Sequence, residues 1–159
     1  VERDARRAAV LERRLQEAGV PAGVVTGDAT AELLLPDQRF DRVLLDAPCS
    51  GIGILGRHAE ARWRKRPDDG ERLAATQRAM LERLAPHLHP GGSLVYAVCS
   101  TDPREGVEVV ESFLRTHDFT RGFVPATFAP FLTAAGDVLV PPGIDGRDGF
   151  YVARLEKRL

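Results

Sequence analysis

Two apolar segments, each with a cysteine just beyond its end, constrain the fold of this chain more than any other feature. Residues 42–45 read Arg-Val-Leu-Leu and lead into Asp46-Ala-Pro-Cys49, while residues 93–98 lead directly into Cys99. Short continuous apolar runs of this kind are typical of strands buried in a parallel sheet. Ligands of open α/β sheets bind at the carboxyl ends of such strands. The chain has two cysteines, so both thiols are expected at the edge of the sheet where ligands bind.

Strand and helix patterns alternate along the chain, which predicts an α/β fold with a doubly wound parallel sheet. No repeat or linker divides the sequence, so residues 1–159 are interpreted as a single domain. The last two expected strands have no helix between them, which indicates an antiparallel hairpin added to the sheet edge. We expect helices over residues 2–19, 71–88 and from Asp102 onward, a short helical turn over 31–35, and strands over 23–26, 40–45, 93–98, 119–124, 139–140 and 149–155.

Composition limits the class of function. The formal net charge is −1, so nucleic-acid binding gains no support from overall charge and needs a local basic patch. No run is long and apolar enough for a signal peptide or a membrane span, which favours a cytoplasmic protein without a membrane partner. Cysteines in a reducing compartment are expected as free thiols. The histidines lack the spacing of metal ligands, so no metal is expected.

A basic segment, residues 57–66, follows the first cysteine. It contains Arg57, His58 and Trp63 among further arginines and one lysine. Arginine binds phosphate groups well, and a tryptophan ring can stack on a base, so these three residues are candidate RNA contacts. The alternative for the segment is a solvated loop in which Trp63 fills a gap in the core.

Three motifs resemble those of a known family. D-A-P-C-S-G at residues 46–51, Y-A-V-C-S-T at 96–101 and D-G-F-Y at 148–151 resemble the RNA cytosine-5 methyltransferases of the Sun, RsmB and NSUN group. The R-H-x-x-x-x-W run from Arg57 to Trp63 most resembles the bacterial RsmB branch. The resemblance covers essentially the whole chain. It implies a Rossmann-like S-adenosylmethionine-dependent methyltransferase sheet with strand order 3-2-1-4-5-7-6 and an antiparallel seventh strand.

The resemblance also implies that this chain starts late in the fold. Val1-Glu2 would be the end of the family's second strand. The first strand, its glycine-rich loop and the preceding RNA-binding region would be absent from this chain. The strand over residues 42–46 would then have an unpaired edge. Because an exposed apolar edge can pair with another chain, edge-to-edge pairing of two chains is one expected consequence.

The family's chemistry assigns roles to three residues near the strand ends. Cytosine C5 is a poor nucleophile, and addition of a thiolate at C6 activates it. By resemblance Cys99 is this nucleophile, Cys49 assists product release, and Asp46 stabilises the activated base at N3. The role of Asp46 requires a raised pKa or a shared proton, which is plausible for a partly buried acid. The plainer interpretations are a small buried side chain for Cys99, a packing residue for Cys49 and a turn cap for Asp46. A disulfide between the two cysteines is disfavoured in a reducing compartment.

The cofactor implied by the resemblance is S-adenosylmethionine. Glu2 would bind its ribose, Asp28 its adenine amino group, and Asp46 would also contact it. Without the resemblance, the Gly-Asp pair at residues 27–28 would be interpreted only as a turn. Similarly, Gly149 is interpreted as a point of close backbone approach or as an ordinary junction between turn and strand.

The expected function is methyl transfer from S-adenosylmethionine to C5 of a cytosine in RNA through a covalent cysteine–C6 adduct. Small-subunit (16S) ribosomal RNA is the expected substrate because of the run from Arg57 to Trp63. The alternatives are a transfer RNA substrate, or a catalytically incomplete piece that serves as an interaction module. A thiol–disulfide enzyme is disfavoured, because the chain has no C-x-x-C motif.

Overall fold

The computed structural model describes residues 1–31 and 38–159. The chain divides into two compact units, Val1–Gln38 and Arg39–Leu159, which are described separately. The single-domain interpretation stays a prediction. The helical turn expected over 31–35 lies, apart from Ala31, outside the described residues.

Among its described residues, the first unit contains one helix, α1 (Ala5–Glu17). The helix begins later than expected because Asp4 caps it, accepting hydrogen bonds from the backbone N–H groups of Arg6 and Arg7 at 2.9 and 3.0 Å. Gly19, at φ +66°, follows its end. The strand expected over 23–26 is wrong in extent. It is reduced to one parallel bridge between Glu2 and Thr26.

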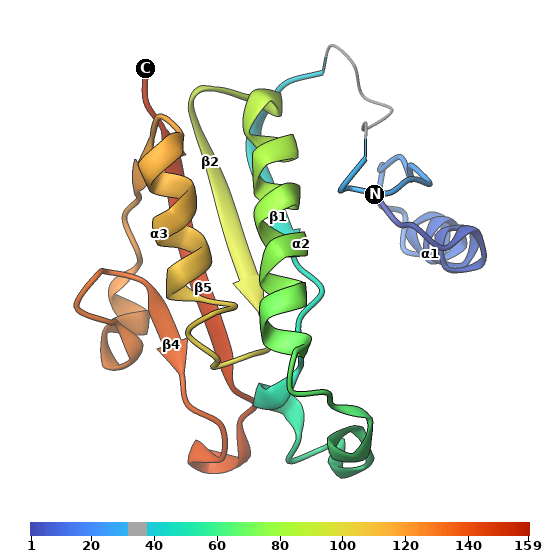
Figure 1. Ribbon diagram of the computed structural model, residues 1–159. Coiled ribbons are helices and arrows are strands. Elements are labelled where there is room, and N and C mark those ends of the chain that lie inside the picture. The colour runs from blue at the N-terminus through green and yellow to red at the C-terminus, as the bar shows by residue number, and fades with distance from the viewer. Residues whose placement is uncertain (32–37) are drawn as a thin grey trace. The chain divides into compact units, whose positions relative to one another are not determined.

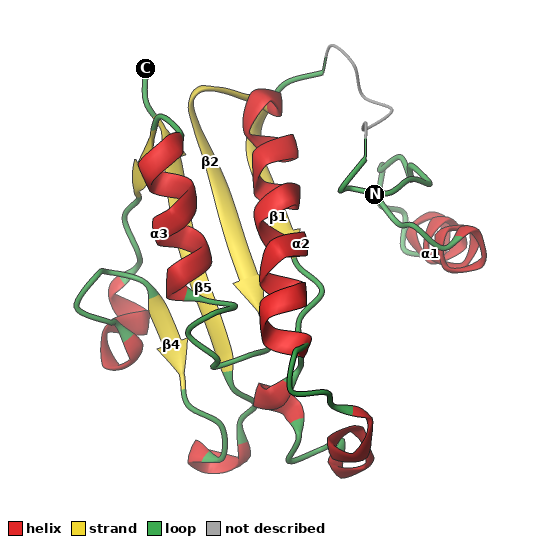
Figure 2. Ribbon diagram, in the orientation of Figure 1, coloured by secondary structure: helices red, strands yellow, loops and turns green. Residues whose placement is uncertain are grey.

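The second unit contains a five-stranded sheet (Figures 1 and 2). Its order is β1-β2-β5-β3, with β4 also paired to β5. Strands β1 and β2 are parallel, and β5 runs antiparallel to β2, β3 and β4. This arrangement reproduces the 4-5-7-6 half of the expected order, and the expected antiparallel pair of the last two strands, β3 and β5, is added to the sheet beside β2. The strands are β1 (Phe40–Asp46), β2 (Leu88–Val98), β3 (Phe119–Arg121), β4 (Val138–Val140) and β5 (Phe150–Lys157).

Helices α2 (Asp69–Leu84) and α3 (Val107–Thr116) lie side by side over one face of the sheet (Figure 1). Their apolar faces and the alternate residues of the strands form the core, and full burial of one leucine side chain contributes about 1.5–3 kcal/mol. Large apolar side chains buried there include Leu81, Leu88, Leu94, Tyr96, Phe113, Phe119, Tyr151 and Leu155.

Two predicted helix boundaries are wrong. The helix expected over 71–88 ends at Leu84, and Leu88 already belongs to β2, because the chain bends through a short 3-10 turn that includes Pro86. The helix expected from Asp102 begins at Val107. Asp102–Gly106 instead forms a turn in which the N–H of Glu105 donates to the carbonyl of Asp102 at 3.0 Å.

Strand β1 is not buried in the manner that its apolar run predicts. The side chain of Leu45 is buried, but Leu44, on the opposite face, is 69% exposed. Among the strands of the described residues, β1 pairs with β2 alone and so ends the sheet on that side. The buried-strand prediction fails at Leu44 because nothing within this unit covers the second face there.

Candidate active site

The two cysteines meet at the carboxyl ends of β1 and β2. Asp46 is in register with Ala97, and the N–H of Ala47 donates to the carbonyl of Ala97 at 2.9 Å, so the two strands end together. The Sγ atoms of Cys49 and Cys99 lie 3.1 Å apart, and both cysteines are free thiols. Both side chains are partly exposed. The structure thus brings together the two thiols that the sequence places 50 residues apart.

The environment of Cys49 distinguishes it from an activated thiol. Burial, the hydrogen bond with Cys99 and the charges of Cys99 and Glu105 together raise the pKa of the Cys49 thiol to about 12, with burial the largest cause. Cys49 is therefore protonated at neutral pH and can donate its S–H to the Sγ of Cys99. A neutral thiol directed at a second sulfur can stabilise negative charge that develops on that sulfur.

The loop that contains Gly149 is hydrogen-bonded to Gly53, in the turn after Cys49, and Gly53 is hydrogen-bonded to Cys99. The N–H of Gly53 donates to the carbonyl of Cys99 at 3.2 Å, and the N–H of Gly149 donates to the carbonyl of Gly53 at 2.8 Å. A Cβ atom on Gly53 would lie 2.1 Å from the carbonyl oxygen of Gly149, so only glycine fits there. A Cβ on Gly149 would meet the Cα of Gly53 at 3.0 Å. The interpretation of Gly149 as a point of close backbone approach is confirmed.

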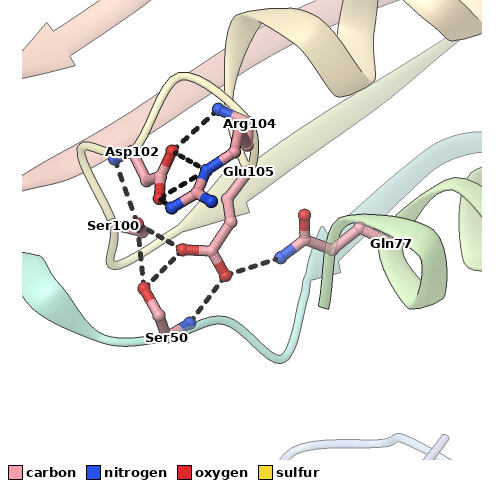
Figure 3. Close-up of polar contacts among 6 residues, drawn as sticks. All are labelled: Ser50, Gln77, Ser100, Asp102, Arg104 and Glu105. Atoms are coloured by element: carbon pink, nitrogen blue, oxygen red, sulfur yellow. Dashed lines mark hydrogen bonds and ion pairs between the residues drawn. The ribbon is translucent and has the colours of Figure 1, made fainter. Parts of the chain in front are cut away.

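A buried carboxylate beneath the cysteine turns was missed by the sequence analysis (Figure 3). Glu105 is fully buried. Its carboxylate accepts the N–H of Ser50 at 2.7 Å, the hydroxyl of Ser50, the hydroxyl of Ser100 at 2.6 Å and the amide of Gln77 at 3.4 Å. The available signal was that a serine follows each cysteine, which provides two hydroxyl donors at matching positions.

Asp46 ends β1 and is exposed. Partial burial, which its proposed role at N3 led us to expect, is therefore not found. Its backbone is nevertheless placed by the register with Ala97, two residues before Cys99. Asp46 and both cysteines consequently lie at the same end of the sheet, as expected for parallel strands.

The two other expected cofactor residues lie together in the first unit. The bridge between Glu2 and Thr26 brings Glu2 beside the turn that carries Asp28. The Glu2 carboxylate accepts the N–H of Asp4 at 2.9 Å, and this hydrogen bond is the main cause of its lowered pKa. The Asp28 carboxylate accepts the hydroxyl and N–H of Thr30 at 2.6 and 2.8 Å, which lowers its pKa. Both carboxyls are therefore ionised acceptors at neutral pH.

The basic segment, residues 57–66, is mostly exposed and includes the 3-10 helix Ala59–Arg64. Trp63 is 85% exposed, which excludes a role as a filler of the core. Arg57 pairs with Asp148 at 3.2 Å, and the ring of His58 lies 3.4 Å from the carboxylate of Glu60. The pair between Arg57 and Asp148 ties the segment to the loop that precedes β5, a contact that sequence reasoning did not anticipate.

A second buried carboxylate was also missed. Asp137 is fully buried and accepts hydrogen bonds from the guanidinium of Arg121 at 3.1–3.2 Å and from the hydroxyl of Tyr151 at 2.7 Å. Burial and this hydrogen bond raise the pKa of Tyr151.

The described residues contain no cluster of three or more His, Cys, Asp or Glu side chains that could hold a metal. None of their helices is long and apolar enough to cross a membrane.

Comparison with known proteins agrees with this geometry. The family model described as 16S rRNA methyltransferase RsmB/F matches residues 1–156. Ribosomal RNA small subunit methyltransferase B of Erwinia tasmaniensis is 40% identical over 164 residues, covering 99% of this chain and 36% of that protein. The chain thus spans about a third of the length of the curated relatives it matches.

Two solved structures share the fold. NSun6 from Pyrococcus horikoshii with SFG is 26% identical at a TM-score of 0.80, over 98% of this chain and 40% of that one. A methyltransferase homolog protein from Pyrococcus horikoshii is 27% identical at a TM-score of 0.77, over 97% of this chain and 51% of that one. A sheet with this strand order, paired cysteines at its carboxyl edge and a family model matched along nearly its whole length lead to one conclusion: the chain belongs to the RsmB/F family of 16S rRNA methyltransferases.

Proposed function

We propose that this chain carries the catalytic residues of an S-adenosylmethionine-dependent methyltransferase that modifies C5 of a cytosine in small-subunit ribosomal RNA, in the cytoplasm. The observation that carries the proposal is the pair of free thiols 3.1 Å apart at the ends of two parallel strands. A single nucleophile needs one thiol, whereas a covalent mechanism with a distinct release step can use two.

In the proposed reaction the Cys99 thiolate adds to C6 of the cytosine, and the electrons of the C5–C6 double bond become available at C5. Bound S-adenosylmethionine supplies an electrophilic methyl group on a sulfonium. After methylation, C5 loses its proton to a base, the electrons of that C–H bond restore the double bond, and the C6–sulfur bond breaks to release the Cys99 thiolate. Cys49, which is protonated, assists this last step by hydrogen-bonding the departing sulfur.

Asp46 is proposed to act on the opposite side of the base. Addition at C6 increases electron density at N3 and O2 of the ring, and a carboxyl group that shares a proton with N3 stabilises it. The exposed position of Asp46 at the end of β1 leaves its carboxyl accessible to a base held by Cys99. This access supports the role, because a carboxyl inside the core could not reach an RNA base.

The residues present also suit S-adenosylmethionine. Its ribose hydroxyls and adenine amino group are hydrogen-bond donors, and the ionised carboxylates of Glu2 and Asp28 are acceptors. The bridge at Thr26 keeps these two acidic residues on neighbouring segments. NSun6, a structural relative, was solved with SFG, an S-adenosylmethionine analogue, which supports the same cofactor here. We therefore assign Glu2 to the ribose and Asp28 to the adenine.

The basic segment is proposed to hold the RNA. The exposed indole of Trp63 offers a face on which an unpaired base can stack, while Arg57 and His58 lie in the same segment for phosphate contact. Ribosomal rather than transfer RNA is favoured by the family that the chain matches.

The test uses the full 159-residue chain with S-adenosylmethionine and RNA in which cytidine is replaced by 5-fluorocytidine. Fluorine at C5 cannot leave as a proton, so the covalent adduct accumulates and migrates as a protein–RNA species on a denaturing gel. We expect the adduct with a small-subunit ribosomal RNA fragment, less with transfer RNA, and none with the Cys99→Ala variant. The Cys49→Ala variant should accumulate adduct even on ordinary RNA.

Two outcomes would count against the proposal. If calorimetry shows no binding of S-adenosylmethionine and no adduct forms, this chain is a catalytically incomplete piece. If the adduct forms equally well in the Cys99→Ala variant, Cys99 is not the nucleophile and the assignment of the two thiols is wrong.

A further inference from the structure

The geometry points to Glu105 as the residue that positions both thiols: its buried carboxylate joins the Cys49 turn to the Cys99 turn and so sets the distance between the two sulfur atoms. The inference rests on the proposed function, since a fixed thiol pair matters most for a reaction that uses both. Glu105 itself is not placed at the substrate. It acts through Ser50 and Ser100, the residues that directly follow the two cysteines (Figure 3).

The first support is the distribution of hydrogen bonds over the carboxylate. One oxygen, Oε1, accepts the N–H of Ser50 at 2.7 Å, and the other, Oε2, accepts the hydroxyls of both Ser50 and Ser100. The two serine hydroxyls also lie 3.3 Å from each other. A single carboxylate therefore bridges two turns that are 50 residues apart in the chain. Only a group with two acceptor oxygens can accept all of these donors together.

The second support is the way in which Glu105 is itself held. The hydroxyl of Tyr96, in β2, donates to the backbone carbonyl of Glu105. The side-chain amide of Gln77, in α2, donates to the carboxylate at 3.4 Å and to the carbonyl of Pro48 at 2.9 Å. Strand β2 and helix α2 thus anchor both the bridging residue and the residue that precedes Cys49. The bridge is thus held from two secondary-structure elements, as a positioning residue requires.

The third support is the chemical kind of the groups that donate hydrogen bonds to Glu105. A buried carboxylate is costly unless its charge is compensated. Asp137, the other fully buried carboxylate among the described residues, is paired with the guanidinium of Arg121. The four hydrogen bonds to Glu105 come from neutral groups, and three of them come from the serines of the cysteine turns. The buried carboxyl group of Glu105 therefore depends on these turns for most of its hydrogen-bond donors, and the two turns depend on Glu105 for the link between them.

The experiment measures the thiol pair directly and needs neither RNA nor S-adenosylmethionine. Dibromobimane forms a C–S bond to each of two nearby thiols with loss of two bromides, and it becomes strongly fluorescent only when both bonds have formed. Because the chain has two cysteines, the fluorescence reports Cys49 and Cys99 alone. Mass spectrometry of dilute protein identifies the cross-link within one chain, and the Cys99→Ser variant supplies the blank.

We expect Glu105→Gln and Ser100→Ala to slow the cross-linking about 10-fold or more, because misplacement by about 1 Å is sufficient to change a reaction rate by this order. Ser50→Ala should have a smaller effect, since the backbone N–H of Ser50 still reaches the carboxylate. The double variant Glu105→Gln/Ser100→Ala should be no slower than Glu105→Gln alone, because both changes break the same link.

Asp137→Asn is the matched control. It alters a carboxylate that is equally buried but bonded to Arg121 and Tyr151 rather than to the cysteine turns. It should lower the free energy of unfolding without changing the cross-linking rate of the folded protein. Circular dichroism establishes that each variant is folded, and if Glu105→Gln does not fold, Ser100→Ala and Ser50→Ala decide.

The inference is overturned if folded Glu105→Gln or Ser100→Ala cross-links at the wild-type rate, or if Asp137→Asn slows cross-linking as much as they do. The cross-linking experiment can refute this inference without refuting the proposed function, and the RNA adduct assay can refute the proposed function without refuting this inference. A chain that makes no RNA adduct can still show the dependence of cross-linking on Glu105, and an active chain can lack it. In an active chain, Glu105→Gln should lower kcat while leaving the Kd for S-adenosylmethionine unchanged.

Discussion

The cysteine turns, residues 47–53 and 99–105, and the basic segment, residues 57–66, differ in how their polar and aromatic side chains are buried. In the turns, polar groups are buried and bonded to one another: Ser50 and Ser100 share the Glu105 carboxylate, and Gly53 fits against Gly149. In the basic segment Trp63 is 85% exposed. A substitution in the turns is therefore expected to change the geometry of the thiol pair, whereas a substitution at an exposed side chain of the basic segment, such as Trp63, is expected to change mainly what the segment binds.

The largest effect is expected at Cys99. Replacing it with alanine removes the proposed nucleophile and should lower methyl transfer by more than about 10⁴-fold, the scale on which loss of a covalent nucleophile acts. RNA affinity, which is proposed to depend on the basic segment, should remain within about two-fold of wild type at fixed salt concentration. Transfer of labelled methyl groups and a filter-binding assay measure the two quantities. A parallel fall in RNA affinity would show that the two regions are not separable.

The next effect is expected at Gly53. A Cβ atom there would overlap the carbonyl oxygen of Gly149, so Gly53→Ala should lower the free energy of unfolding by about 3 kcal/mol or more. Urea unfolding followed by circular dichroism measures this. Gly56→Ala is the matched control, because a Cβ at Gly56 meets nothing within 4 Å. Equal stability of the two variants would refute the close contact between the loops.

A third effect concerns the protonation of Cys49. In a Cys99→Ser variant Cys49 is the remaining thiol, and burial, the largest cause of its raised pKa, persists. Because the thiolate is the form that reacts, alkylation by iodoacetamide at pH 8 should be at least about 10-fold slower in the folded chain than in urea. The rate should continue to rise above the ordinary pKa of 9.0. A folded-state midpoint at or below 9 would contradict the burial argument.

The raised pKa of Cys49 also makes the free energy of unfolding depend on pH. The folded chain keeps the Cys49 proton up to about pH 12, whereas the unfolded chain loses it near 9. The unfolded state therefore binds fewer protons in this window, and the free energy of unfolding should fall as pH rises from about 9 to 12. Below pH 9 this contribution is fully present. Cys49→Ala should flatten that part of the profile.

The smallest effect is expected at Trp63. Loss of one stacked base costs about 1–3 kcal/mol, so Trp63→Ala should weaken RNA binding about 10-fold. Thermal stability should not change, because the side chain is exposed. Trp63→Phe should restore part of the affinity, since it keeps an aromatic face. Normal RNA affinity in Trp63→Ala would leave the arginines of the segment as the RNA contact.

Local sequence was sufficient for much of the fold. The apolar runs at β1 and β2 and the helical spacing of α2 predicted those elements to within a few residues, because backbone periodicity depends on neighbouring side chains. Local sequence patterns failed at residues 102–106, where a proline and acidic residues predicted the start of a helix that begins only at Val107. Glu105 lies in the turn that these residues form and accepts two hydrogen bonds from Ser50, which is 55 residues away in the chain. A local sequence pattern cannot reveal a partner at that separation.

The sequence by itself indicated the family of this protein and the placement of its two cysteines. Two cysteines in family motifs, each after a buried-strand pattern, identified the edge of the sheet on which both thiols lie. Tertiary structure alone decided the 3.1 Å approach of the sulfurs, the exposure of Leu44 and the burial of Glu105. The physical reason is that residue type fixes what a group can donate or accept, whereas only the folded chain fixes which partners come within reach and which surfaces exclude water.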